Sequence, residues 1–135
     1  MIVKIKLLTD TAKLPTRHRG TGFDVYADES CVLRTGDVRI VKTGIASEFK
    51  TGIILLGERS GMALKNIDVK AGWIDPDYRG EWGVLLRNMG PDYEITRGDR
   101  ICQALPLDPG TVYLEHVAEL SETERGDGGF GSTGK

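Results

Sequence analysis

Regularly spaced turn signals constrain the fold of this chain more than any other feature. Thr-Gly pairs recur every eight residues, at positions 35–36, 43–44 and 51–52, and 18 of the 135 residues are glycine. Short runs of β-branched and aliphatic residues fill the intervals, over 38–41, 45–49 and 53–56. Turns at this spacing are typical of sandwiches and barrels rather than of alternating strands and helices. We therefore predict an all-β domain.

Four further segments carry strand patterns. Residues 1–8 alternate, with aliphatic side chains on one side and lysines on the other. The others cover residues 82–86, 101–107 and 111–118, with an Asp-Pro-Gly turn between the last two. Only residues 60–65 suit a helix, with Ser60 placed to cap its first turn. The expected domain thus contains many short strands and one short helix.

Charge and composition exclude several classes of protein. The formal net charge is -2, so the chain lacks the basic footprint of a duplex-binding protein. Its longest uninterrupted apolar run, residues 53–56, is far too short for a membrane span. We expect no nucleic-acid partner and no membrane contact. Lysines interrupt the first apolar stretch, unlike in a signal peptide, and Cys31 and Cys102 are isolated, so we expect a reduced, cytoplasmic chain.

The last residues differ in composition from the rest. Residues 121–135 contain Arg125, Phe130 and several glycines but little that can be buried. We predict a β domain over 1–120 followed by a flexible arm over 121–135. The arm matches the G-x-G-x-x-G expression, but no strand leads in and no helix follows, which argues against a Rossmann turn. The arm either is a disordered tail or closes over a phosphorylated, ring-bearing ligand.

A pair of carboxylates flanks a proline in the middle of the chain. Asp75 and Asp77 lie two positions apart, so they face the same side of an extended backbone. Pro76 fixes one φ angle between them and stiffens the segment. A stiff pair suits a general base that holds a water molecule. The alternative is an Asp-Pro-Asp turn in which both carboxylates bond backbone amides, and the residues alone favour that turn.

Two other polar segments are candidates for binding. Glu58-Arg59-Ser60-Gly61 begins the expected helix, where free amides, a guanidinium and a hydroxyl suit an anion such as phosphate. An ordinary cap beside an exposed arginine is the alternative. Residues 97–103, Arg-Gly-Asp-Arg-Ile-Cys-Gln, lead into a predicted strand and alone indicate a hairpin turn with surface charges.

Together with Thr21-Gly22-Phe23-Asp24-Val25, these segments resemble the five ordered motifs of the trimeric dUTP pyrophosphatases, or dUTPases. Order and spacing agree over nearly the whole chain, and the third motif (72–80) and the fifth (125–134) are the most specific. The resemblance implies an all-β, jelly-roll-like β-sandwich or barrel with one short helix and a flexible C-terminal arm. It also implies a homotrimer whose active sites are shared between subunits and closed by the arm.

The resemblance assigns a role to each matching residue. Asp75 would be the catalytic base that orients and deprotonates the water attacking the α-phosphorus, and Tyr78 would pack beneath the deoxyribose and exclude a ribose. The hairpin backbone over 69–74 would bind the uracil edge, and Asp24 would support the site. The residues expected to bind substrate are Arg59, Ser60, Gly61, Val69, Gly72, Trp73, Ile74, Tyr78, Gln103, Arg125, Phe130, Gly131 and Ser132.

The implied reaction is the hydrolysis of dUTP to dUMP and pyrophosphate. The resemblance implies Mg2+ held by the triphosphate oxygens and water, with no protein ligand. Two alternatives remain open. One is a dCTP deaminase of the same fold, including a bifunctional form, and the other is a dUTP-sensing binding protein that acts through a protein partner.

Four positions depart from the usual pattern of the family. Thr21 replaces a frequent alanine, Trp73 is bulkier than the usual aliphatic residue, and Lys70 lies near the expected uracil hairpin. Glu58 stands where a small residue or proline usually precedes Arg-Ser. An acid beside a phosphate site is unfavourable unless it is turned away or paired, so the local geometry at Glu58 is an open question.

Overall fold

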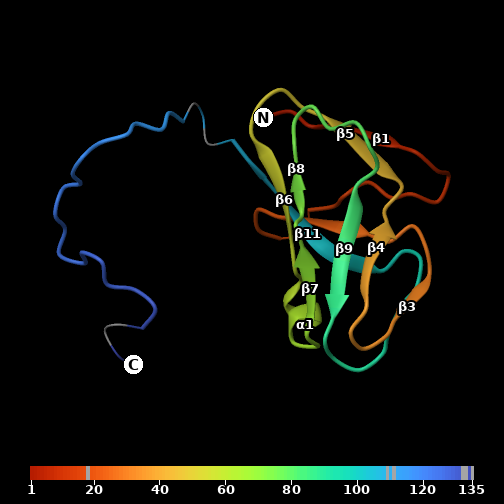
Figure 1. Cartoon of the computed structure of the whole chain (residues 1–135). Coiled ribbons are helices and arrows are strands. Elements are labelled where there is room, and N and C mark those ends of the chain that lie inside the picture. The colour runs from red at the N-terminus through yellow and green to blue at the C-terminus, as the bar shows by residue number, and fades with distance from the viewer. Residues whose placement is uncertain (18, 109, 111, 132–133, 135) are drawn as a thin grey trace.

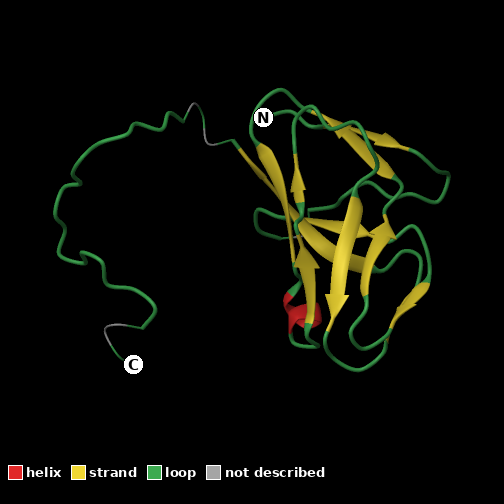
Figure 2. Cartoon of the chain, viewed as in Figure 1, coloured by secondary structure: helices red, strands yellow, loops and turns green. Residues whose placement is uncertain are grey.

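A computed structural model describes residues 1–17, 19–108, 110, 112–131 and 134. Strands dominate these residues, and a single short helix accompanies them (Figures 1 and 2). In chain order the elements are β1 (Lys4–Leu7), β2 (Phe23–Tyr26), β3 (Cys31–Leu33), β4 (Val38–Lys42), β5 (Ile45–Glu48), β6 (Ile53–Gly57), α1 (Ser60–Ala63), β7 (Ile67–Lys70), β8 (Trp73–Ile74), β9 (Gly83–Asn88), β10 (Tyr93–Ile95) and β11 (Arg100–Leu107). The predicted all-β class is confirmed.

The strands form four antiparallel sheets. The largest has the order β2-β11-β6-β8, the next is β4-β9-β7, and two pairs, β1-β5 and β10-β3, complete the domain. Most neighbours within a sheet are distant in the sequence, as expected of a jelly-roll-like connection rather than of simple hairpins. The hairpin expected over 69–74 does not form a paired ladder: β7 pairs with β9 and β8 pairs with β6, so this segment passes from one of the two larger sheets to the other.

Alternating burial explains why these segments form strands. In β9, Val84, Leu86 and Asn88 are buried whereas the residues between them are only half-buried. Trp82, immediately before β9, is 2% exposed and donates its Nε1–H to Ser47 Oγ at 3.0 Å. A large buried aromatic with its one donor satisfied anchors the chain that follows the third motif.

Two local predictions were wrong. Residues 112–118, the described part of the strand predicted over 111–118, form no strand and expose Tyr113 and Leu114. A β pattern shows that a segment can pair, but an isolated strand is not stable without a partner. Ser60 does not cap α1: it is the first helical residue, and Arg59 occupies the N-cap position without a side-chain hydrogen bond.

Beyond β11 the chain leaves the β domain (Figure 1). Residues 112–131 contain neither strand nor helix, and nearly all of their side chains are exposed. The Nε–H of Arg125 donates to the carbonyl of Gly128 at 2.9 Å, a bond within the segment itself. No helix in the described part of the chain is long and apolar enough to cross a membrane.

Candidate functional site

Residues of several motifs line one groove on the sheet β2-β11-β6-β8. The groove has a volume of about 420 Å³, and Gly22, Glu58, Trp73 and Gln103 contribute to its walls. Trp73 lies on β8 opposite Leu55 of β6, and its side chain is 71% exposed. The β-sheet register therefore gathers parts of the first, second, third and fourth motifs around a common surface.

A buried carboxylate joins two arginines. Asp24 on β2 is 7% exposed, with Oδ1 at 3.3 Å from Arg59 Nε and Oδ2 at 3.4 Å from Arg100 Nη1. Gln103 on β11 is the register partner of Asp24. One negative charge shared between two guanidinium groups leaves a net positive charge, which suits a polyanion such as a phosphate chain. Asp24 thus fixes the place of Arg59, in agreement with a supporting role.

The loop after β6 presents backbone donors beside Arg59. The carbonyl of Arg59 accepts the N–H groups of Met62 and Ala63 at 2.9 and 3.0 Å, and the buried Met62 holds the short helix against the core. The N–H groups of Ser60 and Gly61 precede these bonds and have no partner within the helix. A Cβ added at Gly61 would meet no atom within 4 Å, so the approach to these donors is open.

The hairpin between β7 and β8 has an unusual backbone. Ala71 has φ 55° and Gly72 has φ 80°, so both central residues of the turn are left-handed. A left-handed φ favours glycine or asparagine, so Ala71 is strained there. Gly72 is required for a second reason, because an added Cβ would lie 2.6 Å from the carbonyl oxygen of Leu56. The same Leu56 donates its N–H to the Gly72 carbonyl at 2.7 Å.

The segment from Asp75 to Trp82 is stiff. Tyr78 donates its N–H to the Asp75 carbonyl at 3.2 Å and its hydroxyl to the Glu81 carbonyl at 3.1 Å. The carboxylate of Glu81 accepts the N–H of Gly44 at 2.8 Å, and the N–H of Trp82 donates to the Ile45 carbonyl. No hydrogen bond among the described residues engages the exposed carboxylate of Asp75. The segment therefore presents Asp75 from a fixed backbone.

Asp75 and Arg59 leave opposite ends of the same strand pair. β6 and β8 are antiparallel, with Ile54 opposite Ile74. Continuing this register places Asp75 opposite Ile53, six residues before Arg59. β6 itself ends at Gly57, four residues after Ile53, so at about 3.3 Å per residue the strand spans about 13 Å. Within one chain, therefore, Asp75 and Arg59 lie beyond opposite ends of the β6-β8 pair.

Two titratable side chains outside the candidate site, Asp28 and Cys102, have pKa values shifted by their surroundings in the fold. Asp28 is buried, and burial alone would raise its pKa, but the hydroxyls of Thr11 and Thr9 and the guanidinium of Arg97 outweigh this effect and lower the pKa of the carboxyl. Burial raises the pKa of the Cys102 thiol to about 12, so this thiol is no nucleophile. Among the described residues, no group of three His, Cys, Asp or Glu side chains could hold a metal ion.

The predicted arm residues lie apart from the domain. Arg125, Phe130 and Gly131 belong to the extended segment, and the side chain of Phe130 is fully exposed. Ser132, also predicted to bind substrate, lies outside the described residues. Within one chain the structure thus brings together Arg59, the first turn of α1 and Gln103, while Asp75 lies beyond the opposite end of the β6-β8 pair and the described arm residues extend away from the domain.

Two contacts at the site were missed by sequence reasoning. Arg100 shares the Asp24 carboxylate with Arg59, although the fourth motif alone indicated only a turn with surface charges. The carboxylate of Glu58 accepts the N–H of Val69 at 3.0 Å, so this acid is paired rather than turned toward Arg59. The unusual acid at position 58 was the one available signal, and it did not reveal the partner.

The three comparisons with known proteins agree with one another. The dUTPase family model matches residues 10–134. The chain is 43% identical over 133 residues to the deoxyuridine 5'-triphosphate nucleotidohydrolase of Mus musculus, covering 95% of this chain and 82% of that protein. It is 41% identical over 142 residues to the protein of the same name from Nautilia profundicola, with 100% of both covered. The solved structure of the Staphylococcus bacteriophage 80alpha dUTPase with dUPNHPP superposes with a TM-score of 0.87, at 28% identity and with 99% of both chains covered.

Proposed function

The chain belongs to the dUTPase family, and we propose that it hydrolyses dUTP to dUMP and pyrophosphate by attack of water on the α-phosphorus. The single observation that best supports a phosphate ligand is the pair of arginines held on the buried Asp24 beside the open first turn of α1 at Ser60 and Gly61. Phosphoryl transfer depends mainly on positioning and charge neutralisation, which these groups can supply.

Asp75 is the proposed catalytic base. Its carboxylate is exposed and leaves a backbone fixed by Tyr78 and Trp82, so it can hold a water molecule in a defined direction. It accepts the proton of that water as the oxygen bonds to the α-phosphorus and the bond to the leaving pyrophosphate breaks. No nucleophilic side chain is required for this direct displacement.

Arg59, the amides of Ser60 and Gly61, and Gln103 would bind the phosphates in this proposal. Arg59 is oriented by Asp24 and remains partly exposed, so its other guanidinium donors are available to phosphate oxygens. Gln103 lies beside Asp24 on the neighbouring strand and can donate its side-chain amide near the α-phosphate.

The hairpin backbone from Val69 to Ile74, including Gly72 and Trp73, would recognise uracil. Two of its groups are already engaged, the Val69 N–H by Glu58 and the Gly72 carbonyl by Leu56, so the base would bind the others. Backbone groups set for the O4 and N3–H of uracil would mispair with cytosine. Tyr78 would lie beneath the deoxyribose and exclude a 2′-hydroxyl.

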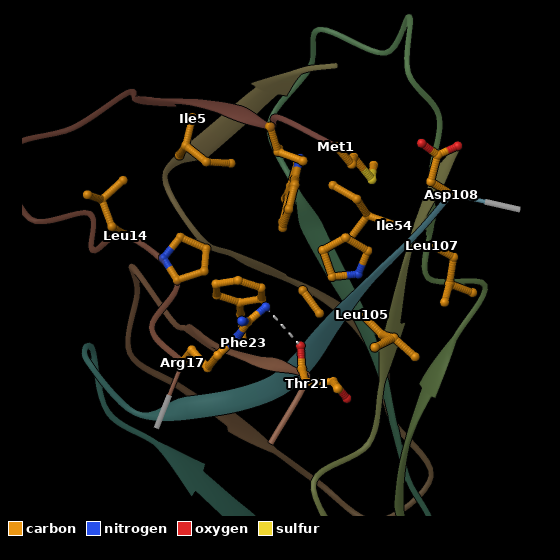
Figure 3. A pocket seen from close by; sticks show the side chains of 15 residues that line it. Met1, Ile5, Leu14, Arg17, Thr21, Phe23, Ile54, Leu105, Leu107 and Asp108 are labelled. Atoms are coloured by element: carbon orange, nitrogen blue, oxygen red, sulfur yellow. Dashed lines mark hydrogen bonds between the residues drawn. The ribbon is translucent and has the colours of Figure 1, made fainter. Parts of the chain in front are cut away.

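A homotrimer with shared active sites would complete the arrangement. Asp75 follows β8 and Arg59 follows β6, at opposite ends of this antiparallel pair, and this placement supports the contribution of the two groups by different chains to one substrate. An apolar region of the surface also supports assembly. An apolar pocket of about 790 Å³ opens beside β11, and Figure 3 shows Ile5, Leu14, Phe23, Ile54 and Leu107 around it. Light scattering should give three times 14.8 kDa.

The arm would close over the bound nucleotide. Arg125 would meet the γ-phosphate, Phe130 would stack on uracil, and the backbone of Gly131 and Ser132 would add donors. Phe130 stands among glycines with its side chain fully exposed, as suits an aromatic that becomes covered only on binding. The ordering of such a segment on ligand binding is a common route to water exclusion.

Mg2+ is the proposed cofactor. The substrate's phosphate oxygens and water supply the oxygen ligands that this ion prefers, and it neutralises charge on the triphosphate. Asp24 is an unsuitable ligand because two arginines already share its carboxylate. We also assign the protein to the cytoplasm, where its free thiols, Cys31 and Cys102, would stay reduced.

Product analysis tests this function against its alternatives. The full-length protein is incubated with dUTP, dCTP and dTTP in the presence of Mg2+, and the products are separated by ion-exchange chromatography. We expect dUMP and pyrophosphate from dUTP and little product from the others. Formation of a deaminated product from dCTP would favour the deaminase, and tight dUTP binding without product would favour a sensing protein.

A further inference from the structure

An irregularity in β11 determines which way Arg100 faces. In the register with β2, Arg100 lies opposite Tyr26. Cys102, two positions further along β11, lies opposite Val25, the direct neighbour of Tyr26, so β11 has one extra residue at this point. Ile101 and Cys102 are accordingly both buried, although they are neighbours in the sequence. Side chains of a regular strand alternate between its two faces, and a β-bulge of this kind interrupts the alternation.

The extra residue brings Arg100 to the face of the sheet that carries Asp24. In a regular strand Arg100 and Gln103, which are three positions apart, would face opposite sides. Here their register partners are Tyr26 and Asp24, which are two positions apart on β2 and therefore face one side. Arg100 Nη1 consequently lies 3.4 Å from Asp24 Oδ2. β-bulges are frequent beside active sites, where they redirect a side chain.

The two oxygens of the Asp24 carboxylate each pair with one arginine. The carboxylate is buried, with Oδ1 at 3.3 Å from Arg59 Nε and Oδ2 on Arg100. No other hydrogen bond to this carboxylate occurs among the described residues. A buried carboxylate oxygen without a partner is costly. Without Arg100, Arg59 would be the one cation left on Asp24 in the described part of the chain, and its Nη groups could supply the missing donor.

We propose that Arg100 is a positioning residue that occupies Asp24 Oδ2 and so leaves the Nη groups of Arg59 free for the phosphates. This inference rests on the proposed function, which places the phosphates on Arg59. In the structure Arg59 uses Nε toward Asp24, and its Nη groups have no partner among the described residues. Loss of Arg100 would draw Arg59 into a bidentate pair with Asp24, a geometry that guanidinium and carboxylate groups favour. All three side chains belong to one chain, so the inference holds whichever subunit supplies Asp75.

Three substitutions at position 100 test this role. Arg100→Met removes the charge and the donor, Arg100→Gln keeps an uncharged donor, and Arg100→Lys keeps a cation. Arg100 directs a single nitrogen at Asp24, so a lysine can replace this contact, as it could not at a bidentate site. The matched control is Arg97→Met, because Arg97 also pairs with a buried carboxylate, that of Asp28 at 3.7 Å, outside the proposed site.

Each full-length variant is compared with the wild type in kcat and KM for dUTP, in thermal unfolding, and in the dissociation constant of pyrophosphate measured by calorimetry. Pyrophosphate probes the phosphate contacts without the base. We expect Arg100→Met to raise KM and the pyrophosphate dissociation constant about tenfold each, with little change in kcat, because one charge-assisted hydrogen bond to the phosphates is lost. Arg100→Gln should change both constants in the same direction. Arg100→Lys and Arg97→Met should bind pyrophosphate like the wild type.

An Asp24→Asn background decides whether Arg100 acts through Asp24. A neutral asparagine does not draw Arg59 away from the phosphates, so adding Arg100→Met there should change KM by less than about twofold. An equal loss in both backgrounds would overturn the positioning role, because Arg100 would then act on the phosphates directly.

Two other results would also refute the role of Arg100. One is unchanged pyrophosphate binding in Arg100→Met, or in Arg100→Gln if the methionine variant does not fold. The other is an equal loss in Arg97→Met, which would show that any weakened pair with a buried carboxylate has this effect. If the wild type binds pyrophosphate but does not hydrolyse dUTP, the proposed function fails, and pyrophosphate binding still tests Arg100.

Discussion

The place of Tyr78 depends on the absence of a side chain at Gly80. A Cβ added to Gly80 would overlap the hydroxyl and Cζ of Tyr78 and would lie 2.8 Å from its Cε2. Gly80 is not among the residues with positive φ, so its backbone accepts alanine without strain. The ring of Tyr78 is the obstacle, and it is the movable end of a side chain. Gly80→Ala should therefore displace this ring and leave the backbone in place.

The expected magnitude follows from what the ring loses. The displaced hydroxyl gives up its bond to the Glu81 carbonyl, 3.1 Å long and worth about 1 kcal/mol. The ring also leaves the position from which it would exclude a ribose. A differential loss of the same size, about 1 kcal/mol, corresponds to about a fivefold change. We expect the ratio of kcat/KM for dUTP to that for UTP to fall about fivefold in Gly80→Ala, mainly because UTP becomes a better substrate.

Steady-state kinetics with both nucleotides measure this ratio. Tyr78→Leu should relax the ratio at least as much as Gly80→Ala. If Tyr78→Leu relaxes it and Gly80→Ala does not, the role given to Gly80 is refuted. If neither does, Tyr78 does not select the sugar.

Three further predictions concern catalysis, the arm and stability. Asp75→Asn should retain nucleotide binding by calorimetry and lose hydrolysis on the order of a hundredfold or more, and wild-type turnover would exclude Asp75 as the base. A chain ending at Glu124 should stay folded by circular dichroism but hydrolyse dUTP far more slowly; equal rates would make the arm a mere tail. Because the pKa of Asp28 is lowered on folding, its contribution to stability is present above its unfolded pKa and is lost as the pH falls through the folded value. Asp28→Asn should reduce the loss of unfolding free energy at acid pH, measured by urea unfolding at a series of pH values. An unchanged pH dependence would contradict this.

The sequence predicted strands well where one face of a strand is buried. The alternation around β9 and the aliphatic runs of β6 and β11 correspond to strands whose buried residues form the core. β2 was not predicted although Val25 is buried in it, and β3 and β10 were not predicted either. β3 and β10 have three residues each, and their pairing joins Cys31 to Ile95, so a local pattern carries little of the information that defines them. Short strands of this kind are set by tertiary pairing rather than by periodicity.

The family motifs indicated which residues belong to the site but not how they contact one another. Asp24 and Arg100 are 76 positions apart, and their contact depends on the register between β2 and β11, which includes an irregularity just after Arg100. Glu58 and Val69 are separated by 11 positions and a helical turn. Such contacts follow from the relative placement of strands, which a single sequence does not specify.

The remaining question is how Asp75 and Arg59 could meet on one substrate. Bending of the chain is an unsuitable answer, since Asp75 is followed by a segment that Glu81 and the buried Trp82 fix to β5 and its preceding turn. Arg59 is equally fixed, through Asp24 on β2. Two fixed groups at opposite ends of the β6-β8 pair would meet on one substrate if the strand end of one chain lay against the opposite strand end of another. We therefore propose that catalysis depends on assembly, and dilution below the dissociation constant of the oligomer should abolish activity while the subunit fold persists.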